Sequence, residues 1–288
     1  MDTNSIVHLP ITKVNRSAST EISDALAIEE PLEIRLEYGP NDNRLIKNIS
    51  VTMRTPGNDD ELALGFLFTE GVIKDHKRVN SINHTFIACA ENKENIIVVS
   101  LADGAEPNLH NTERNFYTTS SCGVCGKGSI NAIKTVSAFT YEQDDCQISP
   151  DIIYQLPKIL QENQRVFADT GGLHASALFD LNGRFMMLRE DVGRHNALDK
   201  LIGAALKNNK LPLNKHILLL SGRASFELIQ KSAMAGINII AAVGAPSSLA
   251  VQTAEEFNIT LIGFLRNERF NIYTAAHRVL IPHYENTH

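Results

Sequence analysis

The strongest constraint on the fold is a regular alternation of strand and helix patterns in the second half of the chain. Runs that are almost entirely apolar, such as residues 216–220 and 237–243, alternate with longer stretches that have a helical pattern. Strands that are apolar on both faces are typical of a parallel sheet with helices on both sides. We therefore expect a three-layer α/β domain. Its helices are expected at 152–163, 196–208, 225–235 and 247–257, and its strands at 175–179, 185–190, 216–220, 237–243 and 259–264.

The N-terminal part of the chain follows the period-two pattern of strands. Residues 32–38 alternate apolar and polar side chains, and a turn-forming Gly-Pro-Asn-Asp-Asn separates them from a partner strand at 48–54. A helix over 61–68, capped by Asn58 or Asp59, should follow. A second hairpin is expected from 85–90 and 95–101, and residues 1–20 should form a loose or strand-forming arm. The predicted organisation is a β-hairpin-rich α+β domain (1–115), a connecting segment with a loop and a helix at 129–139 (116–150), and the α/β domain (151–288).

Composition narrows the possible partners and compartment. The chain has 27 basic and 33 acidic side chains, a formal net charge of −6, and no long basic run. That balance argues against general binding to nucleic acid or to a membrane surface. Residues 1–16 lack a signal-peptide core, and no stretch approaches about 18 apolar residues. Four cysteines are too few for a disulfide framework, so we expect a cytoplasmic protein with reduced thiols.

The strongest chemical signal is Ser-Cys-Gly-Val-Cys-Gly at 121–126. Its glycines make the loop accessible to a large partner. Lys127 and the amino end of the helix expected from Ser129 place positive potential beside Cys122 and Cys125, which favours the nucleophilic thiolate. An accessible thiolate can accept a sulfane sulfur as a persulfide, and a second thiol can release that sulfur or form a disulfide.

The motif alone leaves other interpretations open. Cys-x-x-Cys can be half of a zinc site, but no second Cys-x-x-Cys and no His-x-x-x-His supplies the missing ligands. A thioredoxin-like site would lie between a strand and a long helix, with few glycines. The pair can also be incidental. Sulfur or redox chemistry is the favoured interpretation, and no tightly bound metal is expected.

Three turns at successive strand ends predict a second site. The turns are 221–225, 243–248 and 264–269, and they combine small residues and hydroxyls with arginines. Backbone N–H groups, hydroxyls and arginines on one sheet edge suit a phosphate-bearing, nucleotide-like ligand. His174 and His195 lie in two other polar stretches. Each can be an acid–base group or ligand, but a hydrogen-bonded structural role is favoured for both.

Together these segments resemble the formate dehydrogenase accessory protein family, FdhD. The resemblance covers roughly residues 28–282. It rests on six long motifs: Ile-Ser-Val-Thr-Met-Arg-Thr-Pro-Gly at 49–57, Glu-Leu-Ala-Leu-Gly-Phe-Leu-Phe-Thr-Glu-Gly at 61–71, Ser-Cys-Gly-Val-Cys-Gly-Lys at 121–127, Thr-Gly-Gly-Leu-His-Ala-Ser-Ala at 170–177, Glu-Asp-Val-Gly-Arg-His-Asn-Ala-Leu-Asp-Lys at 190–200 and Ser-Gly-Arg-Ala-Ser-Phe-Glu at 221–227.

The resemblance implies a specific activity. Family members accept sulfur from a cysteine desulfurase as a persulfide on the Cys-x-x-Cys loop. They deliver it to the molybdenum of the bis(molybdopterin guanine dinucleotide) cofactor, which formate dehydrogenase requires. By position, Cys122 then carries the persulfide and Cys125 is its partner. The cofactor-binding segment falls on Phe264, Leu265, Arg266, Asn267, Glu268 and Arg269.

The family also implies a homodimer whose larger domain resembles cytidine deaminase. The deaminase zinc signature is missing, because Ala175 and Ser176 follow His174 and no Pro-Cys-x-x-Cys occurs. Two rival functions remain at this point. One is a chaperone that binds the cofactor without covalent chemistry, and the other is a zinc-dependent, deaminase-like enzyme.

Overall fold

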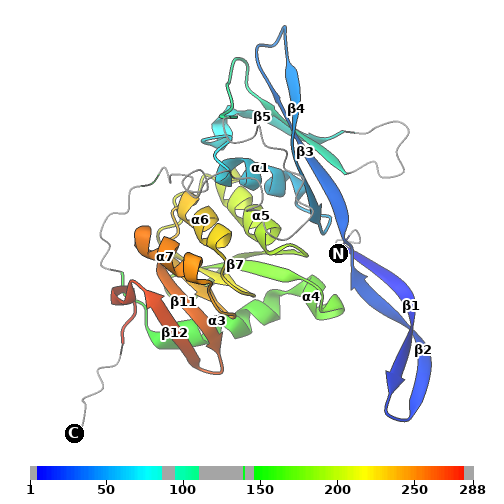
Figure 1. The fold of residues 1–288 in the computed structure, drawn as a ribbon, viewed down its shortest axis with the longest axis vertical. Helices are drawn as coiled ribbons and strands as arrows, with labels where there is room; N and C mark the ends of the chain where they lie inside the picture. The colour runs from blue at the N-terminus through cyan, green and yellow to red at the C-terminus, as the bar shows by residue number, and fades with distance from the viewer. Residues whose placement is uncertain (1–4, 86–94, 110–138, 140–145, 282–288) are drawn as a thin grey trace. The chain divides into compact units, whose positions relative to one another are not determined.

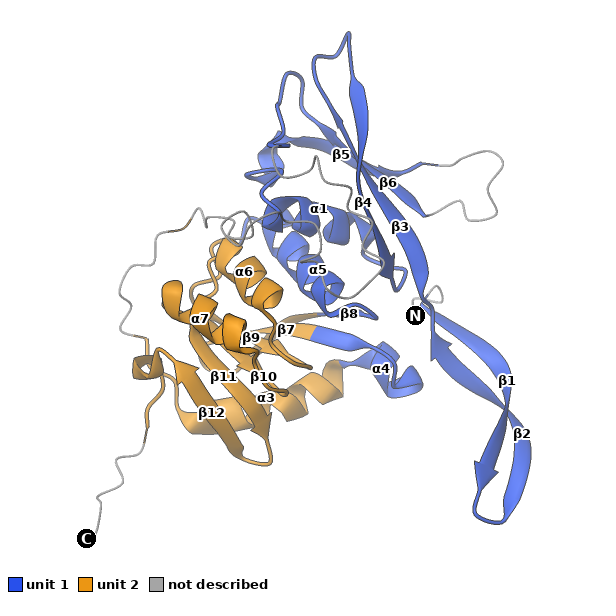
Figure 2. Cartoon of the chain, in the orientation of Figure 1, with its two compact units in different colours: residues 1–135, 164–175, 189–210 blue, residues 136–163, 176–188, 211–288 orange. Residues whose placement is uncertain are grey.

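The computed structural model describes residues 5–85, 95–109, 139 and 146–281 of the chain (Figure 1). The chain separates into two compact units (Figure 2). Unit 1 comprises residues 1–135, 164–175 and 189–210, and unit 2 comprises residues 136–163, 176–188 and 211–288.

The described strands of unit 1 form a two-stranded antiparallel ribbon and a four-stranded sheet. The first 27 residues include the ribbon of β1 (Ile6–Asn15) and β2 (Ala18–Ala27), which pair only with each other within the described residues. A four-stranded sheet follows. Its spatial order is β4 (Leu45–Arg54), β3 (Glu30–Tyr38), β6 (Ile96–Leu101) and β5 (Val79–His84).

The predicted hairpin of residues 32–38 and 48–54 is confirmed as β3 and β4. Alternate side chains of β3, at Leu32, Ile34 and Leu36, are fully buried, as the period-two pattern requires. The strand predicted at 85–90 stays a prediction, whereas the observed antiparallel partner of β6 is β5 at residues 79–84. Its polar sequence, Val-Asn-Ser-Ile-Asn-His, gives a weak alternation signal, and residues 86–90 lie outside the described part.

Two helices pack unusually closely in unit 1. They are α1 (Asp59–Thr69) and α5 (Arg194–Lys207), which correspond to the helices predicted at 61–68 and 196–208. A Cβ atom added at Gly65 of α1 or at Gly203 of α5 would lie 1.9 Å from a backbone carbonyl oxygen of the other helix. Both positions therefore require glycine for the helices to approach this closely. Shorter helical segments of the unit are η1 (His76–Arg78) and α4 (Arg165–Thr170).

A six-stranded sheet lies mainly in unit 2. Its order is β12 (Arg269–Thr274), β11 (Thr260–Arg266), β10 (Ile239–Ala242), β9 (His216–Leu220), β7 (His174–Asp180) and β8 (Phe185–Asp191). Helix α3 (Pro150–Asn163) packs against β9 and β11, α7 (Ser248–Glu256) packs against β11 and β12, and α6 (Phe226–Met234) packs against α7.

The expected parallel sheet is confirmed only in its centre. Strands β9, β10 and β11 are parallel, whereas β7 is antiparallel to β9, and β12, which the sequence pattern missed, is antiparallel to β11. Apolar runs carry no information on strand direction, and the two-residue turn between β11 and β12 imposes an antiparallel hairpin at that edge. The fold class is thus mixed α/β, and the deaminase-like three-layer arrangement stays a prediction.

The two units divide the chain differently from the three predicted segments. Unit 1 includes residues 164–175 and 189–210, which the sequence division placed in the C-terminal domain. The predicted middle segment, 116–150, lies largely outside the described residues, so the three-segment division stays a prediction. Among the described helices, none combines the length and the apolar character needed to cross a membrane.

Candidate functional site

Cys122 and Cys125, and nearly all of the helix expected after them, lie outside the described residues. Their assignment as the sulfur-carrying pair therefore stays a prediction from the sequence. The described chain reaches Leu109 in unit 1 before this segment begins. Across the described ranges, no group of three or more His, Cys, Asp or Glu side chains is placed to hold a metal ion.

The segment predicted to bind the cofactor is the tip of the β11–β12 hairpin in unit 2. Asn267 and Glu268 form its two-residue turn, with φ angles of 51° and 52°. Two successive positive φ angles are the signature of a type I′ turn, whose twist matches that of the flanking strands. Arg266 and Arg269 are paired across the hairpin, and both side chains are exposed. Two guanidinium groups therefore project from neighbouring strands at one point.

Phe264 has the most unusual backbone of this segment. Its φ angle is 54°, in the left-handed region that a bulky residue adopts only with strain. The strand register shifts between Gly263 and Arg266, which marks a β-bulge. This bulge leaves Phe264 37% exposed and places Leu265 in the core at 1% exposure. An exposed aromatic ring on a strained bulge is a suitable platform for a planar base.

The strand-end turns predicted to bind phosphate do lie together in unit 2. Their backbones, however, are joined to each other, and four N–H groups are already used as donors. The N–H of Ala224 donates to Ala245 O (3.2 Å), and that of Gly244 donates to Gly222 O (3.0 Å). The N–H of Ser247 donates to Ala224 O (3.0 Å), and that of Phe264 donates to Gly244 O (3.1 Å).

The Ser247 hydroxyl also has a structural task, because it accepts a hydrogen bond from Ala250 N (3.2 Å) at the start of α7. These groups are therefore not free for a ligand, and the predicted phosphate site would depend more on arginine side chains than the sequence indicated. Arg223, Arg266 and Arg269 are exposed and available for that contact.

The polar stretch at 190–200 forms a buried network in unit 1 that sequence reasoning missed. Asp191 and Lys200 are 0% and 2% exposed, and Lys200 Nζ lies 2.7 Å from Asp191 Oδ2. Lys200 also donates to Thr55 O (2.8 Å), and Thr55 N donates to Asp191 Oδ2 (3.1 Å). Gly193 N and Asn196 Nδ2 donate to Asp191 Oδ1 (2.8 and 3.1 Å). The network ties the end of β4 to α5.

Every polar atom of the Asp191 carboxylate is thus paired. Burial raises the pKa of Asp191, while the adjacent Lys200 ammonium opposes that rise. The arrangement holds the 191–196 turn in one conformation. We assign it a structural role, because both side chains are buried and paired with each other.

His174 lies close to this turn because β7 and β8 are neighbouring strands joined by a short connection. Burial lowers the pKa of His174, and the positive charge of Arg194 lowers it further. Asp191 acts in the opposite direction, and His195 adds a smaller lowering effect. The neutral imidazole is therefore favoured, which fits the structural role expected from the sequence.

Replacing His174 by Gln should make the protein less sensitive to mild acid. In the unfolded chain this imidazole titrates near 6.5, above its pKa in the folded state. As pH falls through that value, the unfolded state takes up the proton first, so folding stability is lost. We expect His174→Gln to lose less stability than the wild type between about pH 7 and about pH 5, measured by urea unfolding. His8→Gln, at an exposed position of β1, is the control, and an unaltered His174→Gln profile would contradict the assignment.

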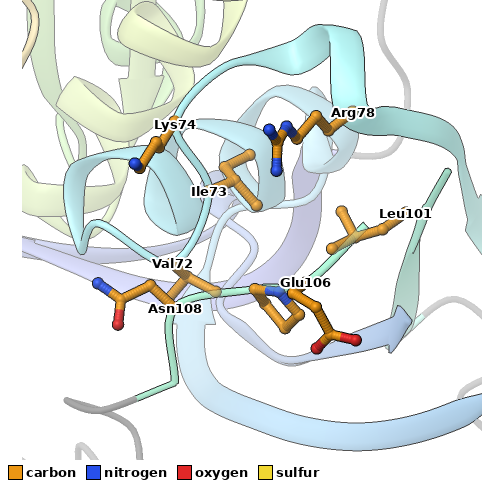
Figure 3. A pocket seen from close by; sticks show the side chains of 8 residues that line it. Val72, Ile73, Lys74, Arg78, Leu101, Glu106 and Asn108 are labelled. Atoms are coloured by element: carbon orange, nitrogen blue, oxygen red, sulfur yellow. The ribbon is translucent and has the colours of Figure 1, made fainter. Parts of the chain in front are cut away.

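A pocket of about 340 Å³ opens on unit 1 beyond the end of α1 (Figure 3). No sequence pattern indicated it, because its walls come from three separate parts of the chain. Its lining residues are Val72, Ile73, Lys74, Arg78, Leu101, Glu106, Pro107 and Asn108.

Comparison with known proteins decides the family. The family model described as FdhD/NarQ matches residues 27–280. The chain belongs to the FdhD/NarQ family. Among curated relatives, the sulfur carrier protein FdhD of Mycolicibacterium paratuberculosis is 49% identical over 273 residues, covering 93% of this chain and 97% of the relative. The protein of the same name from Streptomyces coelicolor is 46% identical, with 94% of each chain covered.

A solved structure supports the same assignment. The crystal structure of a protein assigned as a formate dehydrogenase accessory protein, from Desulfotalea psychrophila, matches with a TM-score of 0.69 and 26% identity. The match covers 96% of this chain and 99% of that one. The resemblance to FdhD noted in the sequence is therefore confirmed. Two of its motifs now have a packing explanation, since 61–71 and 190–200 supply the α1–α5 contact and the buried ion pair.

Proposed function

We propose that this FdhD/NarQ protein is a sulfurtransferase for formate dehydrogenase maturation. In this proposal it accepts sulfur as a persulfide from a cysteine desulfurase and transfers it to the molybdenum of the bis(molybdopterin guanine dinucleotide) cofactor. The observation that carries the proposal is the Cys122–Cys125 pair, which lies within the range matched by the family model. Relatives that match over most of their length are named sulfur carrier proteins, in agreement with this chemistry.

The sulfur relay can be written so that atoms and electrons balance. The Cys122 thiolate attacks the terminal sulfur of the donor's persulfide, the donor's S–S bond breaks, and the donor leaves as a thiolate. The Cys125 thiolate then attacks the Cys122 sulfur, and the terminal sulfur leaves as sulfide toward the molybdenum. A Cys122–Cys125 disulfide results, and a cellular dithiol must reduce it before the next cycle.

The hairpin at 264–269 supplies suitable groups for a guanine nucleotide end of the cofactor. Phe264 offers an exposed ring for the base, and Arg266 and Arg269 offer paired guanidinium groups for the diphosphate. Arginine binds phosphate oxygens through two parallel N–H donors, so a pair of arginines suits a diphosphate.

We expect the protein to act as a cytoplasmic homodimer, and light scattering on the purified protein tests the oligomeric state.

GDP should bind as a substitute for the nucleotide end of the cofactor. We expect Arg266→Ala to weaken GDP binding by roughly 1.5–3 kcal/mol, the value of a hydrogen bond to a charged group. Isothermal calorimetry measures the change. Arg184→Ala, at an exposed arginine in the β7–β8 turn of the same unit, is the matched control. The site is wrong if GDP fails to bind at millimolar concentration, or if both substitutions weaken it equally.

One experiment separates sulfur transfer from the rival functions. The purified protein is incubated with a cysteine desulfurase and labelled cysteine, and peptide mass spectrometry then locates any added sulfur. Label on Cys122 supports the relay. A protein that binds GDP but acquires no sulfur is a cofactor-binding chaperone. Close to one equivalent of zinc bound by Cys122 and Cys125 would instead assign the pair to a metal site.

A further inference from the structure

The pocket on unit 1 carries two cations that have no counter-ion among the residues that the structure describes. Within the described ranges, neither the Lys74 ammonium nor the Arg78 guanidinium takes part in an ion pair, and the Glu106 carboxylate has none either. Figure 3 shows Lys74 and Arg78 along one side of the pocket and Glu106 along the opposite side. All three side chains are exposed. The pocket thus has a positively charged side, ready to pair with an anionic group.

The floor of the pocket is apolar. Val72, Ile73 and Leu101 line it and are only 2%, 5% and 3% exposed, so they belong to the core of unit 1. Hydrogen bonds on either side hold these walls, from Asn108 N to Val72 O (2.9 Å) and from Ala102 N to Arg78 O (2.7 Å). A rigid apolar floor beside two unpaired cations suits a ligand with an apolar group next to a carboxylate.

The size of the pocket limits the ligand further. Small-molecule and cofactor sites have volumes of about 300–1,000 Å³, so 340 Å³ is near the lower limit. That volume accommodates one or two side chains and is too small for a dinucleotide cofactor. Glu106 on the far side also disfavours a uniformly acidic ligand. The chemistry therefore favours a peptide segment with one apolar anchor and an acidic residue on one side of it.

We propose that this pocket docks an acidic, apolar-anchored peptide segment of the protein that donates sulfur. The inference rests on the proposed function, since it needs a protein donor. Its basis is the position of the pocket in the chain. The lining residue Asn108 stands fourteen positions before Cys122, and the chain between them can span at most about 50 Å. This length sets an upper limit on the distance between a donor held here and the accepting thiol, and the pocket and Cys122 belong to the same unit.

The test compares two charge reversals on the same turn. Arg78 lines the pocket, whereas its neighbour Lys77 is exposed on η1 and does not. We expect Arg78→Glu to weaken the binding of the cysteine desulfurase from the same organism roughly tenfold or more, as for a lost charge-assisted contact. Lys77→Glu makes the same change in net charge and should alter the dissociation constant by no more than about twofold at physiological salt. Glu106→Gln should bind at least as tightly as the wild type.

Further measurements make each result decisive. GDP binding and circular dichroism should be unchanged in all three variants, and loading of Cys122 by inorganic polysulfide should match the wild type. Equal weakening by Arg78→Glu and Lys77→Glu, or weakening by neither, would overturn the docking site. So would an Arg78→Glu protein that loses binding to formate dehydrogenase but not to the desulfurase. A wild-type protein that does not bind the desulfurase also overturns it, while polysulfide loading then tests the carrier function separately.

Discussion

Replacing Cys122 by alanine is expected to abolish both persulfide loading and formate dehydrogenase maturation, with the fold and GDP binding intact. Loading requires attack by a thiolate, so its rate depends on thiolate fraction and on access. Cys122 and Cys125 lie in one glycine-rich stretch of the sequence, so the sequence predicts no difference in access between them. Cys125 is nearer Lys127, but a lower thiol pKa also reduces nucleophilicity, so charge does not identify the acceptor. The choice of Cys122 comes from the family resemblance.

Cys125→Ala is the matched variant for this test. It should still acquire sulfur on Cys122, but onward transfer should be slowed because no thiol is left to displace the terminal sulfur. Loading with labelled cysteine and a desulfurase, followed by intact-mass analysis, measures the first step. Formate dehydrogenase activity in cells measures the second. A Cys122→Ala protein that gains sulfur on Cys125 and still supports the dehydrogenase would reverse the assignment of the two thiols.

Lys200→Met should produce the largest loss of folding stability. It leaves the buried Asp191 carboxylate without its counter-ion, and breaking a buried ion pair from one side costs about 3–5 kcal/mol. The double variant Asp191→Asn/Lys200→Met should recover part of this loss, because it buries no charge. Urea unfolding at neutral pH measures both variants. Similar losses for the single and the double variant would show that the ion pair is not the cause.

The pH dependence provides a second criterion for the same network. Without Lys200, burial should raise the pKa of Asp191 further, so the folded state holds the proton more tightly than the unfolded state. The folding stability of the variant then falls as pH rises above the pKa that Asp191 has in the unfolded chain. The stability loss of Lys200→Met relative to the wild type should therefore be largest at neutral pH. The control is Lys207→Met on the same helix, whose pair with Asp60 (2.7 Å) is exposed. It should cost only about 0–1 kcal/mol.

The local sequence was sufficient to predict structural features whose signal comes from neighbouring residues. The apolar run at 216–220 predicted β9 with its observed bounds, and Ser225 and Ser247 were correctly placed at the starts of α6 and α7. Side-chain period, capping residues and turn residues act over a few positions, so they can be recognised without knowledge of the fold. The Cys-x-x-Cys pair and the family motifs are likewise legible in the sequence alone.

Features that depend on residues far apart in the chain were decided only by the tertiary structure. Asp191 and Lys200 are nine positions apart and form a structural pair because Thr55, 136 residues before Asp191, closes the network around them. Gly65 and Gly203 lie in the middle of two helices, where glycine normally lowers helix stability. Their purpose appears only when each faces the backbone of the other helix.

In the candidate site, too, some features were predicted from the sequence and others were revealed only by the tertiary structure. Sequence resemblance predicted a cofactor-binding segment at residues 264–269, but it did not reveal the β12 strand, the left-handed backbone of Phe264 or the cross-strand pairing of Arg266 with Arg269. Lys74, Arg78 and Glu106 come to one pocket only because the segments around β5 and β6 are brought together by strand pairing. The sequence by itself thus determined the family and the local elements, and it supplies the prediction of the reactive thiols. Strand direction, buried charge pairing and the pocket depended on long-range packing, because contacts between distant residues leave no local pattern in the sequence.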